Sequence, residues 1–219
     1  MAEPKITALV WPAGSSTGGV SILSGRSVST DPDEHLLERI GHGDMAAVSI
    51  LVSRKLPKLL SLARRMLNDA AEAEDVAQET LMRTWKQAKV WVPGRARIDT
   101  WMHRVALNLC YDRLRRRRDS VSTDDVEIVD GAISAPAKIE AEQTAKQVQA
   151  AINALSDRQR EAIVLTYYQD LSNQEAASVM DVSVEALESL LARARRSLRA
   201  TMNEHESNSP VPKTAGRGK

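Results

Sequence analysis

The chain has 219 residues, of which 42% are hydrophobic and 27% charged, and its formal net charge is +1. This length supports one large domain or two small ones, and the composition excludes a collagen-like or wholly disordered protein. Aromatic residues make up only 3% and Phe is absent, whereas Ala, Leu, Arg, Glu and Gln are frequent. These residues favour helices over strands, so we expect an all-α fold.

Cysteine and histidine usage excludes several kinds of site. The single cysteine, Cys110, rules out an intrachain disulfide framework and a cysteine zinc site. His42 and His103 lack partners at metal-ligand spacing, so we expect neither a metal nor a cofactor. No nucleophile elbow, phosphate loop or pair of catalytic carboxylates is found, which argues against an enzyme. With no long apolar run and no secretory signal, we expect a soluble cytoplasmic protein without a membrane span.

The first helix is expected to follow a leader. Residues 1–30 are rich in Gly, Ser and Thr and lack helical periodicity, a composition that predicts disorder. Asp31 is suited to cap a helix with Pro32 at its first position. Glu34 would complete a capping box, and Gly41 would end the helix.

Two longer helices should come next. Asp44 is suited to cap the first of them, in which apolar residues recur every three or four positions and which Pro57 should bend or divide. The next helix follows the turn at 68–69 and should carry Trp85 on its inner side. Its outer face is acidic and comprises Glu72, Glu74, Asp75, Gln78 and Glu79.

The charge pattern then changes sign twice. Residues 95–118 contain eight arginines and two aspartates and predict a basic helix capped by Asp99. Residues 119–142 contain seven carboxylates and one lysine, interspersed with Ser, Gly and Pro. Such a stretch is typical of a linker between domains. The expected organisation is a leader at 1–30, a helical domain at 31–118, an acidic linker at 119–137, a second helical domain at 138–203 and a polar tail at 204–219.

The second domain carries the spacing of a helix-turn-helix. Helix starts are indicated at Ser156 and at Ser172, where Glu175 lies three residues on. Ser183 is suited to cap a last helix that reaches about Met202. Small residues on the shorter helix permit a close crossing, so the last helix would be free to lie in a DNA major groove. An αα-hairpin of a helical bundle is the alternative.

Two arginine-bearing helices are candidates for nucleic-acid binding. In the last helix Arg193 and Arg196 could contact phosphates or guanine edges, although a solvated arginine face is the alternative. Glu185 would repel phosphate unless it accepts a hydrogen bond from cytosine N4. In the basic helix, arginines interleave with aromatic residues and Asn108, a mixture that suits unpaired bases. Trp101 could equally be a core residue, and Cys110 is better explained as a packed thiol than as an oxidant sensor.

Several phrases of the sequence together resemble one protein family. LLERIGHGDMAA, AEDVAQETLMRTW and TWMHRVALNLCYDRLRRRR resemble the first conserved domain of bacterial sigma factors of the extracytoplasmic-function (ECF) group. ALSDRQREAIVLTYYQDLSNQEAASVMDVS and ARARRSLR resemble the second. The resemblance implies a binding protein that directs promoter-specific transcription initiation in a stress or envelope response. It further implies three partners: the core RNA polymerase, promoter DNA and an anti-sigma factor.

The resemblance also implies roles for particular residues. Contacts with the clamp helices of the largest polymerase subunit would come from Asp75, Val76, Gln78 and Glu79. Opening and reading of the minus-ten promoter element would involve Arg97, Trp101, Arg104, Asn108, Arg115 and Arg116. Reading of the minus-thirty-five element would involve Ser183, Glu185, Ser189, Arg193 and Arg196. The linker would run along the polymerase active cleft.

The last helix departs from the family pattern. Glu188 and Leu190 stand where many relatives carry Lys or Arg, although Arg195 and Arg196 are retained. A free-standing helix-turn-helix regulator that binds duplex DNA as a dimer is the competing hypothesis. It would require a two-fold interface and a ligand pocket in the first domain.

Overall fold

The computed structural model describes residues 31, 33–94, 96–121 and 136–207, and every regular element in these ranges is helical. The expected all-α class is confirmed. The elements are α1 (Glu34–Gly41), α2 (Met45–Leu67), α3 (Ala70–Ala88), α4 (Ile98–Val121), α5 (Pro136–Asn153), α6 (Asp157–Ile163), the π-helix η1 (Val164–Tyr168), α7 (Asn173–Met180) and α8 (Val184–Ser207). The leader, most of the expected linker and residues 208–219 lie outside the described residues. Among the described helices, none has both the length and the apolar character that a membrane span requires.

Local capping explains why α2 and α3 begin where the sequence predicts. The Asp44 carboxylate accepts hydrogen bonds from the backbone N–H groups of Ala46 and Ala47, and Asp69 accepts one from Glu72. Each cap satisfies donors that a helix start leaves unpaired. Pro57 lies inside α2 without dividing it, so that alternative is wrong. Buried apolar residues on both sides of the proline keep the helix continuous against the core.

The expected caps of α1 and α4 are wrong. Helix α1 begins at Glu34 with Asp33 as its N-cap residue, and the predicted capping box does not form. Glu34 instead accepts a hydrogen bond from the backbone of Gly94, and Asp31 accepts one from Ile98. Because α4 begins at Ile98, Asp99 lies in its first turn. Glu34, Asp99 and one oxygen of Asp31 thus have partners distant in sequence, while the other oxygen of Asp31 accepts from the nearby backbone N–H of Asp33.

The inner side of α3 differs from the prediction in one residue. Trp85 is 47% exposed, whereas Thr80 and Thr84 are buried. The two threonine hydroxyls donate to the carbonyls of Val76 and Thr80, one turn earlier. Because these hydroxyls are satisfied within the helix, the threonines can be buried at low cost. They occupy the inward position that hydrophobicity alone gives to Trp85.

The second unit contains the expected helix-turn-helix. Ser172 and Glu175 form a capping box at the start of α7, and Asp181 ends that helix in the left-handed conformation. The Ser183 hydroxyl accepts from the backbone of Ala186 at the start of α8. Helix α8 extends to Ser207, past the predicted end near Met202.

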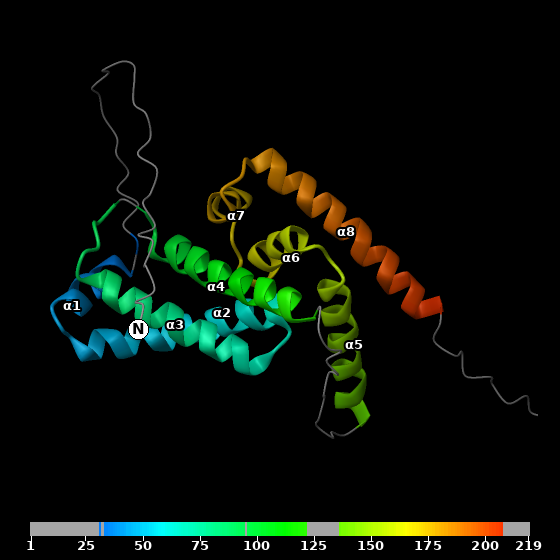
Figure 1. Cartoon of the computed structure of the whole chain (residues 1–219), viewed down its shortest axis with the longest axis horizontal. Coiled ribbons are helices and arrows are strands. Elements are labelled where there is room, and N and C mark those ends of the chain that lie inside the picture. The colour runs from blue at the N-terminus through cyan, green and yellow to red at the C-terminus, as the bar shows by residue number, and fades with distance from the viewer. Residues whose placement is uncertain (1–30, 32, 95, 122–135, 208–219) are drawn as a thin grey trace, which may run out of the picture.

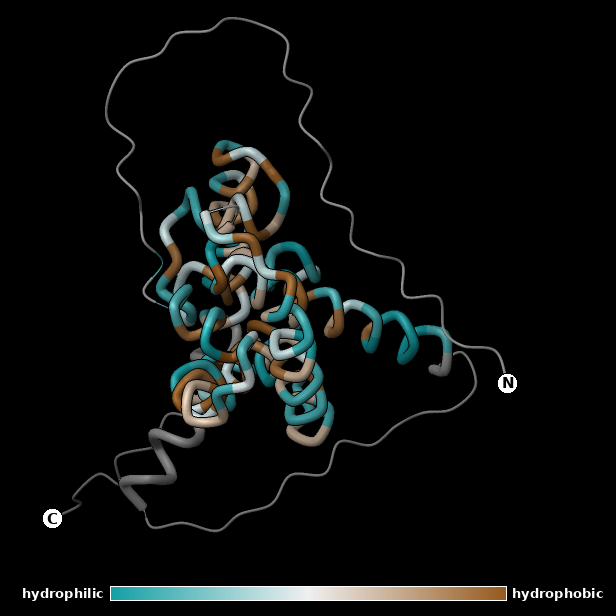
Figure 2. The backbone as a smooth tube through the Cα atoms, turned by 90° about the vertical axis from the view of Figure 1, so that its left-hand side faces the viewer, coloured by the Kyte–Doolittle hydropathy of each residue, from teal (hydrophilic) through white to brown (hydrophobic). Residues whose placement is uncertain are grey.

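The two helical units pack against each other. Helix α4 lies between α2 and α3 on one side and α6 and α7 on the other (Figure 1). Hydrophobic and hydrophilic residues alternate along the helical turns, as expected for amphipathic helices (Figure 2). The apolar faces contribute to a single core cluster that runs through both units. Arg160 reinforces the junction, because its buried guanidinium donates to the carbonyl of Met66 on α2 at 2.8 Å.

Candidate nucleic-acid and partner interfaces

The acidic side of α3 faces solvent. Asp75 and Gln78 are exposed, and Glu79 is half-buried in an ion pair with Arg83 at 2.7 Å. Val76 is different, because it is fully buried in the core. Its expected place among the partner-contacting residues is therefore corrected: Val76 holds α3 in position, and its neighbours form the surface.

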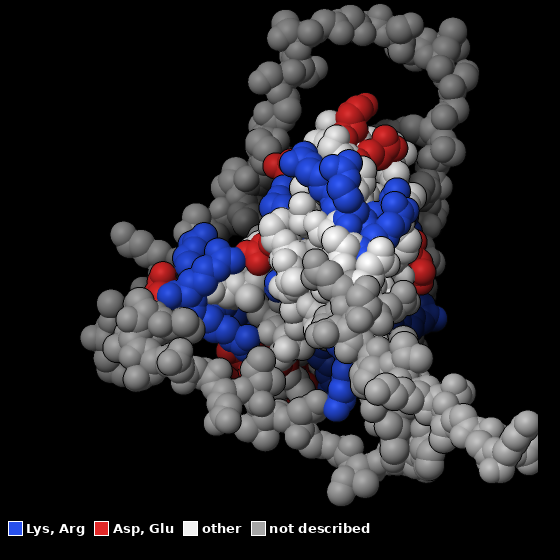
Figure 3. Space-filling view, turned by 90° about the vertical axis from the view of Figure 1, so that its right-hand side faces the viewer, with Lys and Arg blue, Asp and Glu red and all other residues white. Residues whose placement is uncertain are grey.

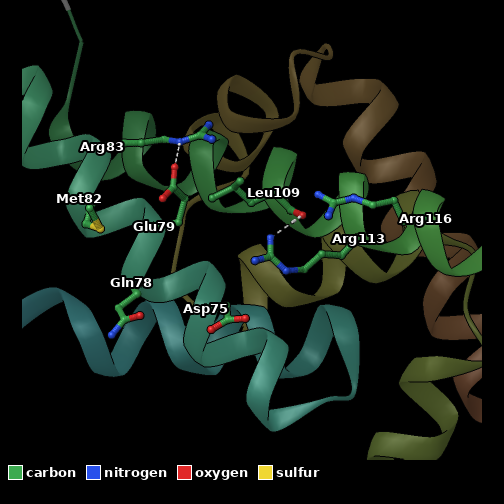
Figure 4. A pocket seen from close by; sticks show the side chains of 8 residues that line it. All are labelled: Asp75, Gln78, Glu79, Met82, Arg83, Leu109, Arg113 and Arg116. Atoms are coloured by element: carbon green, nitrogen blue, oxygen red, sulfur yellow. Dashed lines mark hydrogen bonds and ion pairs between the residues drawn. The ribbon is translucent and has the colours of Figure 1, made fainter. Parts of the chain in front are cut away.

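An open groove of about 400 Å³ lies between this side of α3 and α4 (Figure 4). We call it the α3–α4 groove, and its lining residues are Asp75, Gln78, Glu79, Met82, Arg83, Leu109, Arg113 and Arg116. It combines carboxylates, guanidinium groups and the exposed thioether of Met82. This mixture suits a helical protein partner with both charged and apolar side chains.

Five residues that line the α3–α4 groove are not assigned to it by the sequence: Met82, Arg83, Leu109, Arg113 and Arg116. The family resemblance places Arg116 with the minus-ten residues, whereas in the structure it lines the groove together with Asp75. Met82 was missed, although it lies one turn beyond Gln78 and Glu79 on the same helical face. That spacing was the signal that could have found it.

Four expected minus-ten residues lie at helical spacing along the start of α4. Arg97 precedes the helix, and Trp101, Arg104 and Asn108 follow at intervals of three or four residues. Arg97 and Asn108 are exposed, whereas Trp101 and Arg104 are half-buried. Trp101 packs edge-to-face against Trp91, with ring centroids 6.3 Å apart and an interplanar angle of 84°. The tryptophan thus has a packed side and an accessible side.

A buried ionic cluster fixes the start of α4. Lys55 of α2 lies with its Nζ 2.5 Å from an oxygen of Asp33 and 2.5 Å from an oxygen of Asp99. Burial opposes ionisation of Asp33, but hydrogen bonds from Lys55 and Arg54 lower the pKa of its carboxyl below the ordinary value. Burial likewise opposes the charge of Lys55, yet its two carboxylate partners raise its pKa. Asp33 and Lys55 therefore both keep their charges near neutral pH.

The arginines at the end of α4 have separate environments. Arg115 is exposed. Arg117 donates to the carbonyl of Leu67 at 2.8 Å and pairs with Asp69 and Glu72, so it fastens α4 to the start of α3. The basic run is therefore partly structural.

The outward face of α8 carries the expected minus-thirty-five residues. Glu185, Ser189, Arg193 and Arg196 are all exposed. Figure 3, which views the molecule from the side on which α8 lies, shows Lys and Arg side chains gathered on this face with carboxylates at its margin. Hydrogen bonds from its own backbone N–H and from Ser183 lower the pKa of Glu185, which is ionised at neutral pH. Glu188 lies within 3.4 Å of the Asn173 amide and thus bridges towards α7.

Cys110 lies in the core of the first unit. Its side chain is fully buried, and burial raises the pKa of the thiol to about 12. A thiol with such a pKa is almost entirely protonated near pH 7, and the protonated form is a poor nucleophile. The structure agrees with a packed, unreactive cysteine.

Comparison with known proteins identifies both units. The profile of Sigma-70 region 2 matches residues 51–120, and that of Sigma-70 region 4 matches residues 145–198. The RNA polymerase sigma-H factor of Pseudomonas aeruginosa is 31% identical over 185 residues, covering 78% of this chain and 94% of the relative. The ECF RNA polymerase sigma factor SigW of Bacillus subtilis is 27% identical over 180 residues, covering 77% and 95%.

Solved structures with the same fold lead to the same family. CnrH in complex with the cytosolic domain of CnrY has a TM-score of 0.61 and 27% identity, covering 78% of this chain and 97% of that one. RpoE of Bartonella quintana in complex with the anti-sigma factor NepR has a TM-score of 0.58 and 26% identity, covering 71% and 96%. Sequence and fold therefore agree, and the chain belongs to the extracytoplasmic-function group of bacterial RNA polymerase sigma factors.

Proposed function

We propose that this protein is a promoter-specificity subunit that binds core RNA polymerase in the cytoplasm and has no catalytic site of its own. One observation carries the proposal. A solvent-facing acidic surface on α3 and an arginine- and aromatic-bearing surface on α4 lie on one unit, and a helix-turn-helix lies on the other. Membership of the sigma-factor family supports these three roles.

The polymerase-docking surface is the α3–α4 groove, whose lining includes Asp75 and Gln78. Exposed carboxylates complement basic side chains of a partner and speed its association. The exposed apolar surface of Met82 and Trp85, both on α3, adds area that a protein partner would bury. Clamp helices of the largest polymerase subunit are the occupant that the family implies.

The minus-ten element is opened and read by the first half of α4. Arg97 and Arg104 provide positive charge for the phosphate backbone. Trp101 offers an aromatic surface for an unpaired base, and the amide of Asn108 provides both a donor and an acceptor for a base edge. The ionic cluster of Asp33, Lys55 and Asp99 holds the start of α4 in place, so the side chains that would read the DNA are pre-organised.

The minus-thirty-five element is read by α8. Ser183 caps the helix, Glu185 and Ser189 lie near its start where base edges would be reached, and Arg193 and Arg196 continue towards the DNA backbone. A carboxylate at the start of the recognition helix selects a cytosine N4 donor and disfavours other bases. We therefore expect this chain to prefer a different base in the minus-thirty-five element from relatives that carry Lys or Arg at the positions of Glu188 and Leu190.

Control by an anti-sigma factor is part of the proposal. The related RpoE was crystallised with the anti-sigma factor NepR. A protein of this kind would act by covering the docking and DNA-reading surfaces together.

The proposal is tested by reconstituted transcription. The full chain is mixed with bacterial core polymerase and a library of promoters randomised around the minus-ten and minus-thirty-five elements. We expect transcripts with one defined start that require protein, polymerase and selected sequences at both elements. The proposal is wrong if no such transcripts form and the protein alone binds duplex DNA as a dimer, as a free-standing regulator would.

A further inference from the structure

The two carboxylates near the exposed start of α8 are held in different ways. Glu185 accepts hydrogen bonds from its own backbone N–H and from Ser183, so it is held by the start of its own helix. Glu188 lies with its Oε1 3.4 Å from the Nδ2 of Asn173, the first residue of α7. This second contact joins the recognition helix of the helix-turn-helix to the helix that precedes it.

The amide of Asn173 has a well-defined position. Asn173 directly follows Ser172, whose capping box with Glu175 fixes the start of α7. The side chains of Ala176 and Ala177 are buried, and such small residues permit a close crossing of α7 and α8. The Nδ2 donor of Asn173 therefore approaches α8 from a fixed point on the neighbouring helix.

Glu188 is placed to reach DNA bases. Together with Glu185 and Ser189 it is exposed on α8, the helix that the proposed function places in the major groove. Three residues advance about 4.5 Å along a helix axis, and neighbouring base pairs are about 3.4 Å apart. The side chain of Glu188 therefore faces a base pair beside the one that Glu185 would reach.

The contact with Asn173 favours base reading by Glu188. A free glutamate loses rotamer freedom when it binds a base, whereas one that is already held loses less of it. The contact engages Oε1, and a carboxylate has a second oxygen that can accept a hydrogen bond from a base edge. In the major groove, the matching donor is the N4 amino group of cytosine. Lys or Arg, which many relatives carry here, would instead favour guanine.

We propose that Glu188 determines specificity by selecting a cytosine in the minus-thirty-five element, and that Asn173 is the positioning residue that holds its carboxylate for this contact. The inference rests on the proposed function, because it takes α8 as the helix that reads this element. It adds a second cytosine-selecting residue beside Glu185. The departure from the family pattern at Glu188 thus changes a base preference and does not merely remove a contact.

The base preference is measured with the full chain bound to core polymerase. Transcription is reconstituted on promoters whose minus-ten element is fixed and whose minus-thirty-five element is randomised, and the templates of the transcripts are sequenced. The readout is the ratio of bases selected at each position. Because this ratio is taken within one library, it does not depend on how much of a variant is folded. A loss of stability therefore does not imitate a change in preference.

Two variants test the specificity role of Glu188. Glu188→Ala should lower the preference for cytosine at one position by about tenfold, and that position should differ from the one that Glu185→Ala relaxes. Glu188→Arg should move the preference at the same position to guanine. The specificity role is overturned if Glu188→Ala leaves all base ratios unchanged. It is also overturned if Glu188→Arg raises transcription from every promoter alike, as a phosphate contact would.

Asn173→Ala tests the positioning role. It should lower the cytosine preference at the position read by Glu188 by about threefold, because the carboxylate must then be ordered on binding, and it should leave the other positions unchanged. In the Glu188→Ala background it should have no effect on any base ratio, since Asn173 acts through Glu188. If Asn173→Ala has the same effect in both backgrounds, Asn173 contacts the DNA itself and the positioning role is wrong.

A matched control comes from another contact between α8 and the rest of its unit. The hydroxyl of Tyr167 accepts a hydrogen bond from the Nε of Arg195 at 3.0 Å, about two turns beyond Glu188 on α8. Tyr167→Phe removes this bond but leaves the contact of Glu188 intact, so the base ratios should stay as in wild type. A loss of cytosine preference like that of Asn173→Ala would show that any loosening of α8 has this effect, and the positioning role would be overturned.

Failure of the proposed function has a different signature. If no promoter in the library supports transcription, or if transcripts form without selection at the minus-thirty-five element, the reading role of α8 is wrong and this inference falls with it. If the wild type selects bases there and Glu188→Ala selects the same ones, the proposed function stands and only the role of Glu188 is overturned.

Discussion

The side-chain carboxylate of Asp31 accepts a hydrogen bond from the backbone N–H of Ile98 at 2.7 Å, although 67 positions separate the two residues. Ile98 is the first residue of α4, where backbone N–H groups have no partner within the helix. Asp31 is only 7% exposed and therefore acts as a buried cap supplied by a distant segment. Together with the hydrogen bond that Glu34 accepts from the backbone of Gly94, it fastens the segment before α4 at two points.

The first prediction concerns this distant cap. Asp31→Ala should lower the free energy of unfolding by about 1–2 kcal/mol, because it removes a helix cap at a buried site. In reconstituted transcription it should slow promoter opening more than core binding, since α4 carries the minus-ten residues. Urea denaturation measures the change in the free energy of unfolding. Reconstituted transcription measures promoter opening, and a pull-down with core polymerase measures core binding. Asp31→Asn retains one acceptor oxygen and should be milder, and equal defects in both variants would show that the hydrogen bond is not the cause.

The ionic cluster of Asp33 and Lys55 should make stability depend on pH. The pKa of Asp33 in the folded protein lies below its ordinary value of 3.8. The stabilisation from its charge is therefore present above about pH 4 and is lost as the pH falls through the lowered pKa. Asp33→Asn should cost about 2 kcal/mol at neutral pH, and the difference from wild type should shrink below pH 4. Urea denaturation across this range checks the trend, and a difference that stays constant down to acidic pH would contradict it.

The docking surface gives the third prediction. Asp75→Arg with Gln78→Ala should abolish association with core polymerase while the helical content is unchanged, because charge reversal turns complementarity into repulsion. A pull-down and circular dichroism measure the two quantities. Glu38→Arg reverses an exposed carboxylate on α1 and serves as the matched control. Wild-type association of the double variant would refute the docking assignment.

The fourth prediction separates base reading from backbone contact on α4. Asn108→Ala should impair promoter opening with an altered preference at one minus-ten base, since a base-edge hydrogen bond is lost. Arg115→Ala should weaken all promoters alike and reduce the salt dependence of binding. Arg117 is unsuitable for this comparison because it fastens α4 to α3. Promoter-opening assays on single-base promoter variants measure the base preference of each variant. If Asn108→Ala and Arg115→Ala change that preference equally, the division into a base-reading residue and a backbone-contacting residue is wrong.

The fifth prediction concerns the carboxylate on the recognition helix. Glu185→Ala should relax specificity at one minus-thirty-five base pair by about tenfold, whereas Arg196→Ala should lower affinity for every sequence. Binding titrations on single-base variants distinguish the two. Uniformly tighter binding by Glu185→Ala would mean that the carboxylate only repels phosphate and does not read a base.

Some features of this protein follow from the sequence alone because their causes are local. Asp44 caps α2, and Ser172 with Glu175 caps α7, because each cap lies within three residues of the groups that it satisfies. The helix-turn-helix follows from the same short-range signals. The exposed acidic side of α3 follows from helical periodicity.

Other features were decided only by the tertiary structure. Asp31 and Glu34 satisfy the loop before α4, Trp85 yields its inward place to Thr84, and Arg97 and Arg104 are held by α7. The hydrogen bonds and the ion pair among them join residues far apart in the chain. Capping rules and periodicity describe spacings of a few residues along one helix, whereas a carboxylate or guanidinium pairs with whichever group the packed helices bring within hydrogen-bond distance.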